Sequence, residues 1–200
     1  MSERRRTPRP PRRCAPLPTG LFDGLFELVL SLPRREPCSS SPRRLASLFR
    51  DLARQEPERD PEELSDLIWA HWIAHRDRTA CSTMCAAIEA MDHGAFDLAR
   101  TILDRLVESQ PGWAEAWNKR GTLAFIERRD ADALGDIERT LVLEPRHFGA
   151  VSGFGQICLR HGRLAEAKAA FQMALAINPH LCGLSEAIDE IGWATRSQFH

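Results

Sequence analysis

The stretch AFQMALAINP, residues 170–179, predicts a helix that stops at its final Asn-Pro pair. Two earlier stretches end in the same way, DIERTLVLEP at 136–145 and ILDRLVESQP at 102–111. The three closing prolines are spaced 34 residues apart. A proline pushes the residue before it out of helical geometry, so the chain ends a helix in the same manner three times. This spacing indicates an internal repeat.

The similarity extends through the whole 34-residue unit when the chain is written in rows 80–113, 114–147 and 148–181. Each row has a small residue in its first half, an alanine twelve residues before the proline, and a bulky apolar residue eight before it. These sets are Ala87, Gly121 and Gly155; Ala99, Ala133 and Ala167; and Leu103, Ile137 and Phe171. The pattern predicts two helices per row, crossing closely at the small residues. One such hairpin cannot bury its apolar face alone, so the rows must stack.

Two of these rows carry a family resemblance. WNKRGTLAF…ADALGDIERTLVLEP and VSGFGQICLRHGRLAEAKAAFQMALAINP resemble tetratricopeptide repeats, and their style resembles bacterial members. The matching positions are Trp117, Gly121, Ala133 and Pro145 in the second row, and Gly155, Gly162, Ala167, Phe171, Ala174 and Pro179 in the third. The first row departs from the motif, with Thr83 for the Trp and Ala87 for the Gly. The resemblance covers residues 80–181 and implies an all-α, right-handed solenoid of stacked helix-turn-helix hairpins.

Both flanks of the repeats are predicted to be helical. We interpret residues 45–79 as a degenerate N-terminal repeat or cap, with helix starts at Pro42 and at Asp60-Pro61. Core positions of this segment are Phe49, Ala53, Trp69 and Trp72. Residues 182–200 contain LSEAIDEIGWA, whose apolar residues recur at helical spacing. A helix this short is marginal alone, so we expect it to dock on the last repeat as a C-terminal cap.

The first 44 residues differ in composition from the rest. They carry ten arginines against four acidic residues, while the whole chain has a formal net charge of −1. The segment SERRRTPRPPRR is rich in Arg and Pro, and residues 33–44 are also Pro-rich, so residues 1–44 are predicted to be disordered or linker. An alternative function places a nucleic-acid or acidic-surface tether in this basic segment, with binding that weakens steeply with salt.

Within that segment, residues 20–32 predict an amphipathic or signal-like helix. Charged residues followed by an apolar stretch are typical of export signals, but Asp23 and Glu27 interrupt the apolar part and no small-x-small cleavage site follows. A cytoplasmic location is favoured, and a periplasmic or exported location is the alternative if residues 17–32 act as a signal. No run approaches the roughly 18 apolar residues of a membrane span.

Four potential metal ligands lie close together in the sequence. His71 and His75 are four residues apart, as are Cys81 and Cys85, and the two pairs are symmetric about residue 78. If that residue were the turn of a helical hairpin, the four side chains could bind zinc. The simpler interpretation is that short hairpins place like residues symmetrically and that Cys is a small core residue. A metal-binding protein is therefore an alternative function, not the main one.

No other pattern indicates catalysis. The chain has no glycine-rich phosphate loop, metalloprotease motif or nucleophile elbow, so we expect neither an enzyme nor a cofactor. The six cysteines have irregular spacings that do not resemble a disulfide framework. We expect His147 and His161 to be solvated or to cap a helix. Asp136 and Glu138 are interpreted as part of a solvated helix face.

What remains is binding by surface. The resemblance implies that the first helix of each repeat lines the concave face and contacts peptide partners there. The corresponding residues are Met84, Ile88 and Met91; Asn118, Thr122 and Phe125; and Ser152, Gln156 and Leu159. Relatives that clasp a C-terminal carboxylate use Lys, Arg and Asn where this chain has Met84, Ile88 and Gly149. We therefore expect a non-enzymatic adaptor or scaffold that binds a peptide or amphipathic helix of another protein, without specific binding of nucleic acid.

Overall fold

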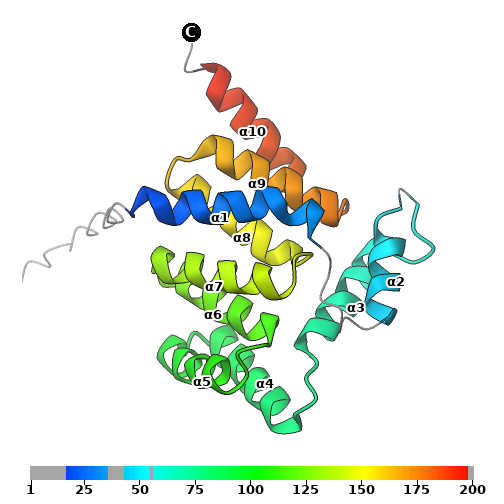
Figure 1. Cartoon of the computed structure of the whole chain (residues 1–200), viewed down its shortest axis with the longest axis vertical. Coiled ribbons are helices and arrows are strands. Elements are labelled where there is room, and N and C mark those ends of the chain that lie inside the picture. The colour runs from blue at the N-terminus through cyan, green and yellow to red at the C-terminus, as the bar shows by residue number, and fades with distance from the viewer. Residues whose placement is uncertain (1–16, 36–42, 55, 198–200) are drawn as a thin grey trace, which may run out of the picture.

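The computed structural model describes residues 17–35, 43–54 and 56–197, and every regular element among them is helical (Figure 1). The predicted disordered tail before residue 17, most of the predicted linker, and the helix start at Pro42 lie outside the described residues. The elements are α1 (Thr19–Ser31), the 3-10 helix η1 (Leu32–Arg34), α2 (Arg43–Leu52), α3 (Pro61–Ile73), α4 (Arg78–Asp92), α5 (Phe96–Ser109), α6 (Ala114–Ile126), α7 (Asp130–Leu143), α8 (Phe148–Arg160), α9 (Leu164–Ile177) and α10 (Leu184–Ser197).

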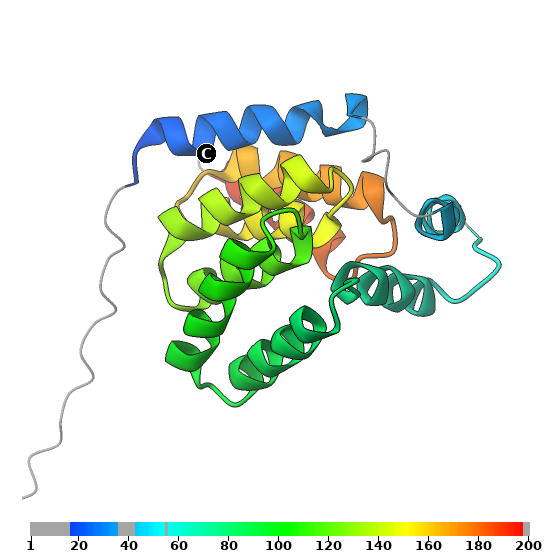
Figure 2. The ribbon, with the colours of Figure 1, turned by 60° about the horizontal axis from the view of Figure 1, so that its bottom comes forward.

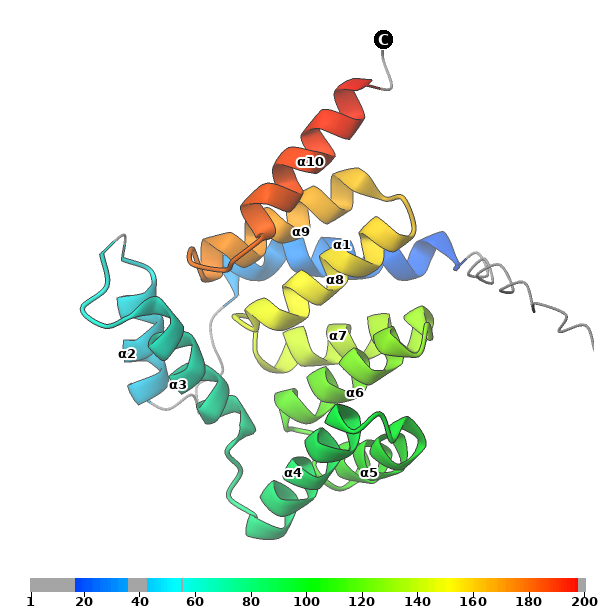
Figure 3. The same ribbon diagram turned by 180° about the vertical axis from the view of Figure 1, so that it is seen from behind.

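Six of these helices form three stacked hairpins, α4–α5, α6–α7 and α8–α9. The first helices α4, α6 and α8 lie side by side, α5 packs between α4 and α6, and α7 packs between α6 and α8 (Figures 1 and 3). The all-α solenoid of helical hairpins predicted from the repeats is therefore confirmed. We call the surface formed by α4, α6 and α8 the first-helix face.

Close crossing within each hairpin depends on the predicted small residues. A Cβ built on Gly155 would lie 2.7 Å from Cδ1 of Phe171, which is fully buried in α9. A Cβ on Gly121 would lie 3.1 Å from Cβ of Asp136 in α7. The phenyl ring of Phe171 thus occupies the space that a side chain at 155 would need. The small residue on the first helix is therefore required by the bulky residue that packs against it from the second helix.

The turns inside the hairpins share a left-handed residue. Gly94 has a φ of 70° and Gly162 a φ of 71°, and the equivalent position of the middle repeat is Arg128, with a φ of 63°. A left-handed conformation costs a residue with a Cβ about 1–2 kcal/mol, whereas glycine adopts it freely. Arg128 therefore adopts an unfavourable backbone conformation, because the turn of the middle repeat has the same geometry as the turns at Gly94 and Gly162.

We predict that Arg128→Gly stabilises the protein by about 0.5–1 kcal/mol, because relief of the left-handed strain exceeds the greater flexibility of glycine in the unfolded chain. Urea unfolding followed by circular dichroism measures this difference. Gly162→Ala is the matched control at the equivalent position and should destabilise by about 1 kcal/mol. A less stable Arg128→Gly protein would show that the arginine side chain stabilises this turn by more than the strain costs.

Helix α1 is part of the core. It lies across α7 and α9, where Phe22, Leu25 and Val29 are buried (Figures 1 and 2). The guanidinium of Arg163 donates a 2.7 Å hydrogen bond to the carboxylate of Asp23. The helix predicted at 20–32 is thus present, but the description of residues 1–44 as disordered or linker does not hold for 19–34. No helix among the described residues combines the length and hydropathy needed to cross a bilayer.

The C-terminal helix α10 packs on α9, with Leu184 and Ile191 buried at the contact. This is the place expected for a capping helix. Its outer side leaves Trp193 69% exposed.

One polar interpretation from the sequence is wrong. Asp136 is not on a solvated face but is buried and accepts two hydrogen bonds from Arg120, at 2.9 and 2.7 Å. Burial raises the pKa of Asp136, and the hydrogen bonds from Arg120 oppose that rise only partly. Arg120 also reaches Asp104 of α5 at 3.1 Å, so one guanidinium joins three consecutive helices of the stack.

Candidate functional site

The nine predicted partner-binding residues fall into three rows on the first-helix face. Each row takes one position from α4, α6 and α8, so its members are 34 residues apart. The rows are Met84, Asn118 and Ser152; Ile88, Thr122 and Gln156; and Met91, Phe125 and Leu159. Whether they contact a partner stays a prediction, but their burial differs from row to row.

The first row is largely unavailable to a partner. Met84 is fully buried in the core between α4 and α5, and Asn118 is 6% exposed with its amide donating to Glu115 at 3.2 Å. Only Ser152 is partly exposed. Sequence spacing places a residue on a helix face, but it does not show how closely the neighbouring helix approaches. Met84 accordingly belongs to the core and is not available to a partner.

The other two rows form an open surface. Thr122 and Gln156 are exposed and Ile88 is half-buried, which gives a mixed polar row. Met91, Phe125 and Leu159 are half-buried and pack onto the repeat cores, which gives a parallel apolar row. The two rows run across the first helices α4, α6 and α8, whose ribbons lie side by side in Figure 3.

A cation fixes the central aromatic residue of the apolar row. The guanidinium of Arg160 lies 3.6 Å from the ring centroid of Phe125 and donates to the backbone carbonyl of the same residue at 3.0 Å. Arg160 is also paired with the buried carboxylate of Asp130, which His161 contacts at 2.8 Å. The ring of Phe125 is therefore held in place before any ligand arrives.

The part of the first-helix face formed by the starts of α6 and α8 is not open, because the α2–α3 hairpin lies on it. Asp60 begins α3 as predicted, accepting a 2.8 Å hydrogen bond from the backbone of Glu62, with Pro61 at the first position. The hairpin does not stack in front of α4–α5 as a preceding repeat would. It packs on the starts of α6 and α8 and on the end of α9 (Figure 3). Of the core residues predicted for 45–79, Phe49 and Trp72 are buried and Trp69 is half-buried, but Ala53 lies after the end of α2 and is exposed. The hairpin also lies in a different place from that of a preceding repeat.

Two tryptophans of α3 make the contact with the repeats. Trp69 lies against Gly149, where a built Cβ would be 2.7 Å from the indole, and Lys119 Nζ lies 5.2 Å from its ring centroid. Trp72 stacks on His147 with ring centroids 4.0 Å apart and an interplanar angle of 13°. Both indoles also contact Phe148, at 5.6 and 5.1 Å between ring centroids. Aromatic stacking therefore joins α3 to the start of α8.

Beneath the tryptophans lies a buried polar network. His147 Nδ1 accepts a 3.1 Å hydrogen bond from the backbone of Ala150, which leaves Nε2 as the ring nitrogen that donates to Glu115 at 2.9 Å. Glu115 is fully buried, and its other oxygen is 3.2 Å from Lys119 Nζ. The predicted capping role of His147 is confirmed, but the side chain is buried and not solvated.

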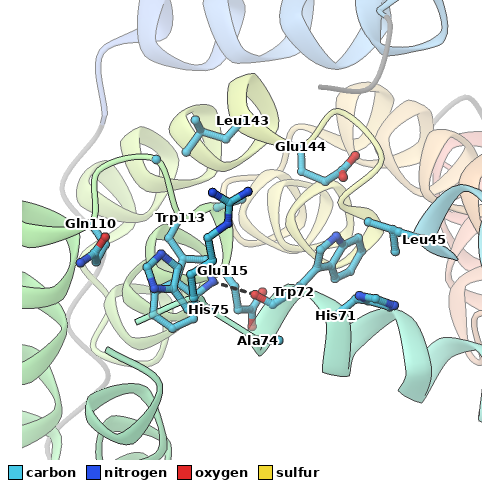
Figure 4. A pocket seen from close by; sticks show the side chains of 13 residues that line it. Leu45, His71, Trp72, Ala74, His75, Gln110, Trp113, Glu115, Leu143 and Glu144 are labelled. Atoms are coloured by element: carbon cyan, nitrogen blue, oxygen red, sulfur yellow. Dashed lines mark hydrogen bonds between the residues drawn. The ribbon is translucent and has the colours of Figure 1, made fainter. Parts of the chain in front are cut away.

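A pocket of about 750 Å³ opens beside this contact, between the hairpin and the first turn of α6 (Figure 4). One wall is Trp72, and the opposite wall is Trp113 with His75 stacked on it at 4.6 Å between ring centroids. Trp113 Nε1 donates a 2.7 Å hydrogen bond to the backbone carbonyl of Trp72 across the floor. Among the other lining residues, Glu115, Glu144 and Arg76 are charged and Leu45 and Leu143 are apolar. Figure 4 labels both glutamates and both leucines.

The alternative of a zinc site is not supported by this geometry. Helix α3 ends at Ile73 and the next residue is extended, so His75 does not share a helix face with His71. The imidazole of His75 is stacked on Trp113, and Cys81 donates to the backbone carbonyl of His75 at 3.2 Å. The described part of the chain contains no group of three or more His, Cys, Asp or Glu side chains arranged to hold a metal ion.

Comparison with known proteins agrees with the repeat architecture. A family profile described as Tetratricopeptide repeat matches residues 86–144 and 128–181. A TPR repeat-containing protein of Rhizobium etli is 34% identical over 149 residues, covering 73% of this chain and 72% of the relative. The chain belongs to the tetratricopeptide repeat family. The relative is bacterial, in agreement with the bacterial style of the repeats.

Solved TPR structures share the fold of this TPR protein. The first TPR of Spaghetti (RPAP3), bound to the HSP90 peptide SRMEEVD, superposes with a TM-score of 0.56 at 19% identity. It covers 58% of this chain and 93% of that structure. The second TPR domain of human RPAP3, in complex with the HSP70 peptide SGPTIEEVD, gives a TM-score of 0.51 at 19% identity, over 56% of this chain and 94% of its own. Identity this low shows a shared fold alone.

Proposed function

We propose that this TPR protein is a non-enzymatic adaptor or scaffold that binds a peptide or helix of another protein on its first-helix face. The observation that carries the proposal is the pair of parallel rows on α4, α6 and α8, one of them mixed polar and the other apolar. An extended or helical segment lying across the three helices would meet hydrogen-bonding groups on one side and apolar groups on the other. TPR proteins are in general interaction modules, which favours binding over catalysis.

The chemistry of the rows indicates the kind of segment. The TPR domains of RPAP3 in the two complexes hold peptides that end in EEVD, an acidic C-terminal sequence. In this chain Met84 is buried, Ile88 is apolar, and Gly149 is covered by Trp69. These three positions offer no cation to a terminal carboxylate. We therefore favour an apolar or amphipathic segment, bound through Met91, Phe125 and Leu159 with polar contacts from Thr122 and Gln156.

The position of α1 bears on the compartment. Val29 and Leu25 are buried against the repeats, so removal of residues 17–32 as a cleaved signal would strip a face of the core. We therefore favour a cytoplasmic protein that retains this helix. Most arginines of the basic N-terminal segment precede residue 17 and lie outside the described residues, so the alternative tether stays a prediction.

The adaptor function is tested by placing bulk and charge on the open rows. We expect Thr122→Arg combined with Gln156→Arg to abolish co-purification of partner proteins, because both positions are exposed and central to the face. Affinity purification followed by quantitative mass spectrometry measures the captured proteins. Thermal unfolding should be unchanged, since exposed substitutions alter stability by about 0.5 kcal/mol or less.

Val142→Arg is the matched control, because Val142 is 46% exposed on the second helix α7, outside the proposed surface. It should retain every partner. Recovery of the same partners by the double variant and by the control would contradict binding on the first-helix face.

A further inference from the structure

We propose that α3 is a self-ligand of the first-helix face. The part of that face formed by the starts of α6 and α8 binds an amphipathic helix with two tryptophans spaced i, i+3. A partner helix of this kind binds there by displacing the α2–α3 hairpin. This inference rests on the proposed function, since it assigns the chemistry of a ligand to a part of the same face.

The first step of the argument is register. Glu115 and Gly149 are 34 residues apart and occupy the same position in the first turns of α6 and α8. Lys119 lies one turn after Glu115. Trp69 rests on Gly149 and under Lys119, and Trp72 rests on the His147 that is bonded to Glu115. Helix α3 therefore contacts the N-terminal parts of two consecutive first helices, α6 through Lys119 and α8 through Gly149, as a ligand lying across the face would.

The second step is that the hairpin is separable from the repeats. The buried residues of the two larger apolar clusters include none from α2 or α3. The third cluster holds the buried residues of the hairpin, to which the start of α8 adds only Phe148. Residues 74–77 join α3 to α4 without helical structure. The hairpin can therefore leave the face without opening the cores of the stacked repeats.

The third step is that α3 only partly fills its binding site on the starts of α6 and α8, which we call the seat. Trp72 Nε1 is buried and has no hydrogen-bond partner among the described residues. The pocket of about 750 Å³ lies next to the same indole, between Trp72 and Trp113 (Figure 4). An unpaired buried donor weakens the contact that contains it. A partner helix could pair the indole N–H at the position of Trp72 with a hydrogen-bond acceptor, or place a side chain in the pocket. Such a helix would bind this seat better than α3 does.

The charges around the seat restrict the ligand further. Lys119 lies over Trp69, and Glu115 is already paired with His147 and Lys119. The site under α3 therefore holds a lysine over an aromatic platform, paired with a buried glutamate, and the pocket beside it adds a second cation, Arg76. Helix α3 itself carries Glu62 and Glu63 in its first turn and no arginine or lysine along its length. We infer that the partner helix is neutral or acidic and carries two tryptophans one turn apart.

The experiment uses the full-length chain and a fluorescein-labelled peptide of residues 60–75. Fluorescence anisotropy compares the wild-type protein with the variant Trp69→Ala, Trp72→Ala, in which the internal helix is weakened. The variant should bind the peptide at least about tenfold more tightly, because a tethered competitor lowers the apparent affinity of the same sequence in trans. A peptide with both tryptophans replaced by alanine is the matched control and should bind neither protein.

A second variant tests the inference even if the double-tryptophan variant does not fold. Gly149→Leu places a side chain where Trp69 lies, so hydrogen exchange should rise in 61–73 while α6 to α9 stay protected. Equal peptide affinity for the wild-type protein and a folded double-tryptophan variant, binding of the alanine peptide, or unchanged exchange in 61–73 of Gly149→Leu would each overturn the inference. In those cases partner loss in Thr122→Arg, Gln156→Arg would still support the proposed function.

Discussion

Replacing Val29 with aspartate is expected to destabilise the protein by at least about 3 kcal/mol, which removes much of the stability of an ordinary domain. Val29 is fully buried where α1 crosses α7 and α9, so the new carboxylate would have neither water nor a partner. The expected result is a large fall in the urea midpoint, or an unfolded protein at room temperature. Circular dichroism during urea titration measures it.

Leu30→Asp is the matched control, one residue further along the same helix. Leu30 is 44% exposed, so this substitution should change the free energy of unfolding by about 0.5 kcal/mol or less. The same comparison decides the role of residues 17–32. If the two variants were equally stable, α1 would be a dispensable segment and its removal as a signal would again be open.

The second large effect is expected at Gly155. Gly155→Ala should destabilise by about 2–3 kcal/mol, because its methyl group would overlap the ring of the fully buried Phe171 and force α8 away from α9. Gly153→Ala on the same helix is the control. Its Cβ would meet only Ile137 Cδ1 at 3.6 Å, and alanine favours a helix over glycine by about 0.5–1 kcal/mol, so this variant should be slightly more stable.

A double-mutant cycle identifies the cause. Phe171→Leu shortens the side chain that meets position 155, so Gly155→Ala should cost much less in the Phe171→Leu background than in the wild-type protein. Additive effects of the two substitutions would mean that Gly155 is required for a reason other than close approach to Phe171.

Most of the repeat architecture could be predicted from the sequence because its determinants are local and periodic. The prolines at 111, 145 and 179 each end the second helix of a hairpin, and the glycines at 121 and 155 each face the other helix of their own hairpin, where Gly155 meets Phe171. A periodic pattern of this kind fixes one unit and its stacking partner. The same logic located the rows of the first-helix face, although it did not show that Met84 is buried and Phe125 is held by Arg160.

The placement of the N-terminal helices could not be predicted in the same way. The apolar residues of α1 indicate that one face is buried, but not that it is buried on α7 and α9. Trp69 and Trp72 likewise indicate a core, and the 34-residue frame extended backward suggested a preceding repeat. Their contacts with Gly149 and His147 join segments about 80 residues apart, and no local pattern encodes such a contact. The sequence similarly gave no sign that Glu115 is fully buried.

The ion pair between Asp23 and Arg163 also has a consequence for synthesis on the ribosome. The two residues are 140 positions apart, so α1 emerges long before the helix that completes its site. At about 5–20 residues per second, the apolar side of α1 waits on the order of ten seconds without its final neighbours. The hairpins can form one by one during that time, because their contacts are local. The nascent chain therefore carries an uncovered apolar helix at its leading end, and this is the stage at which a chaperone would have a substrate to hold.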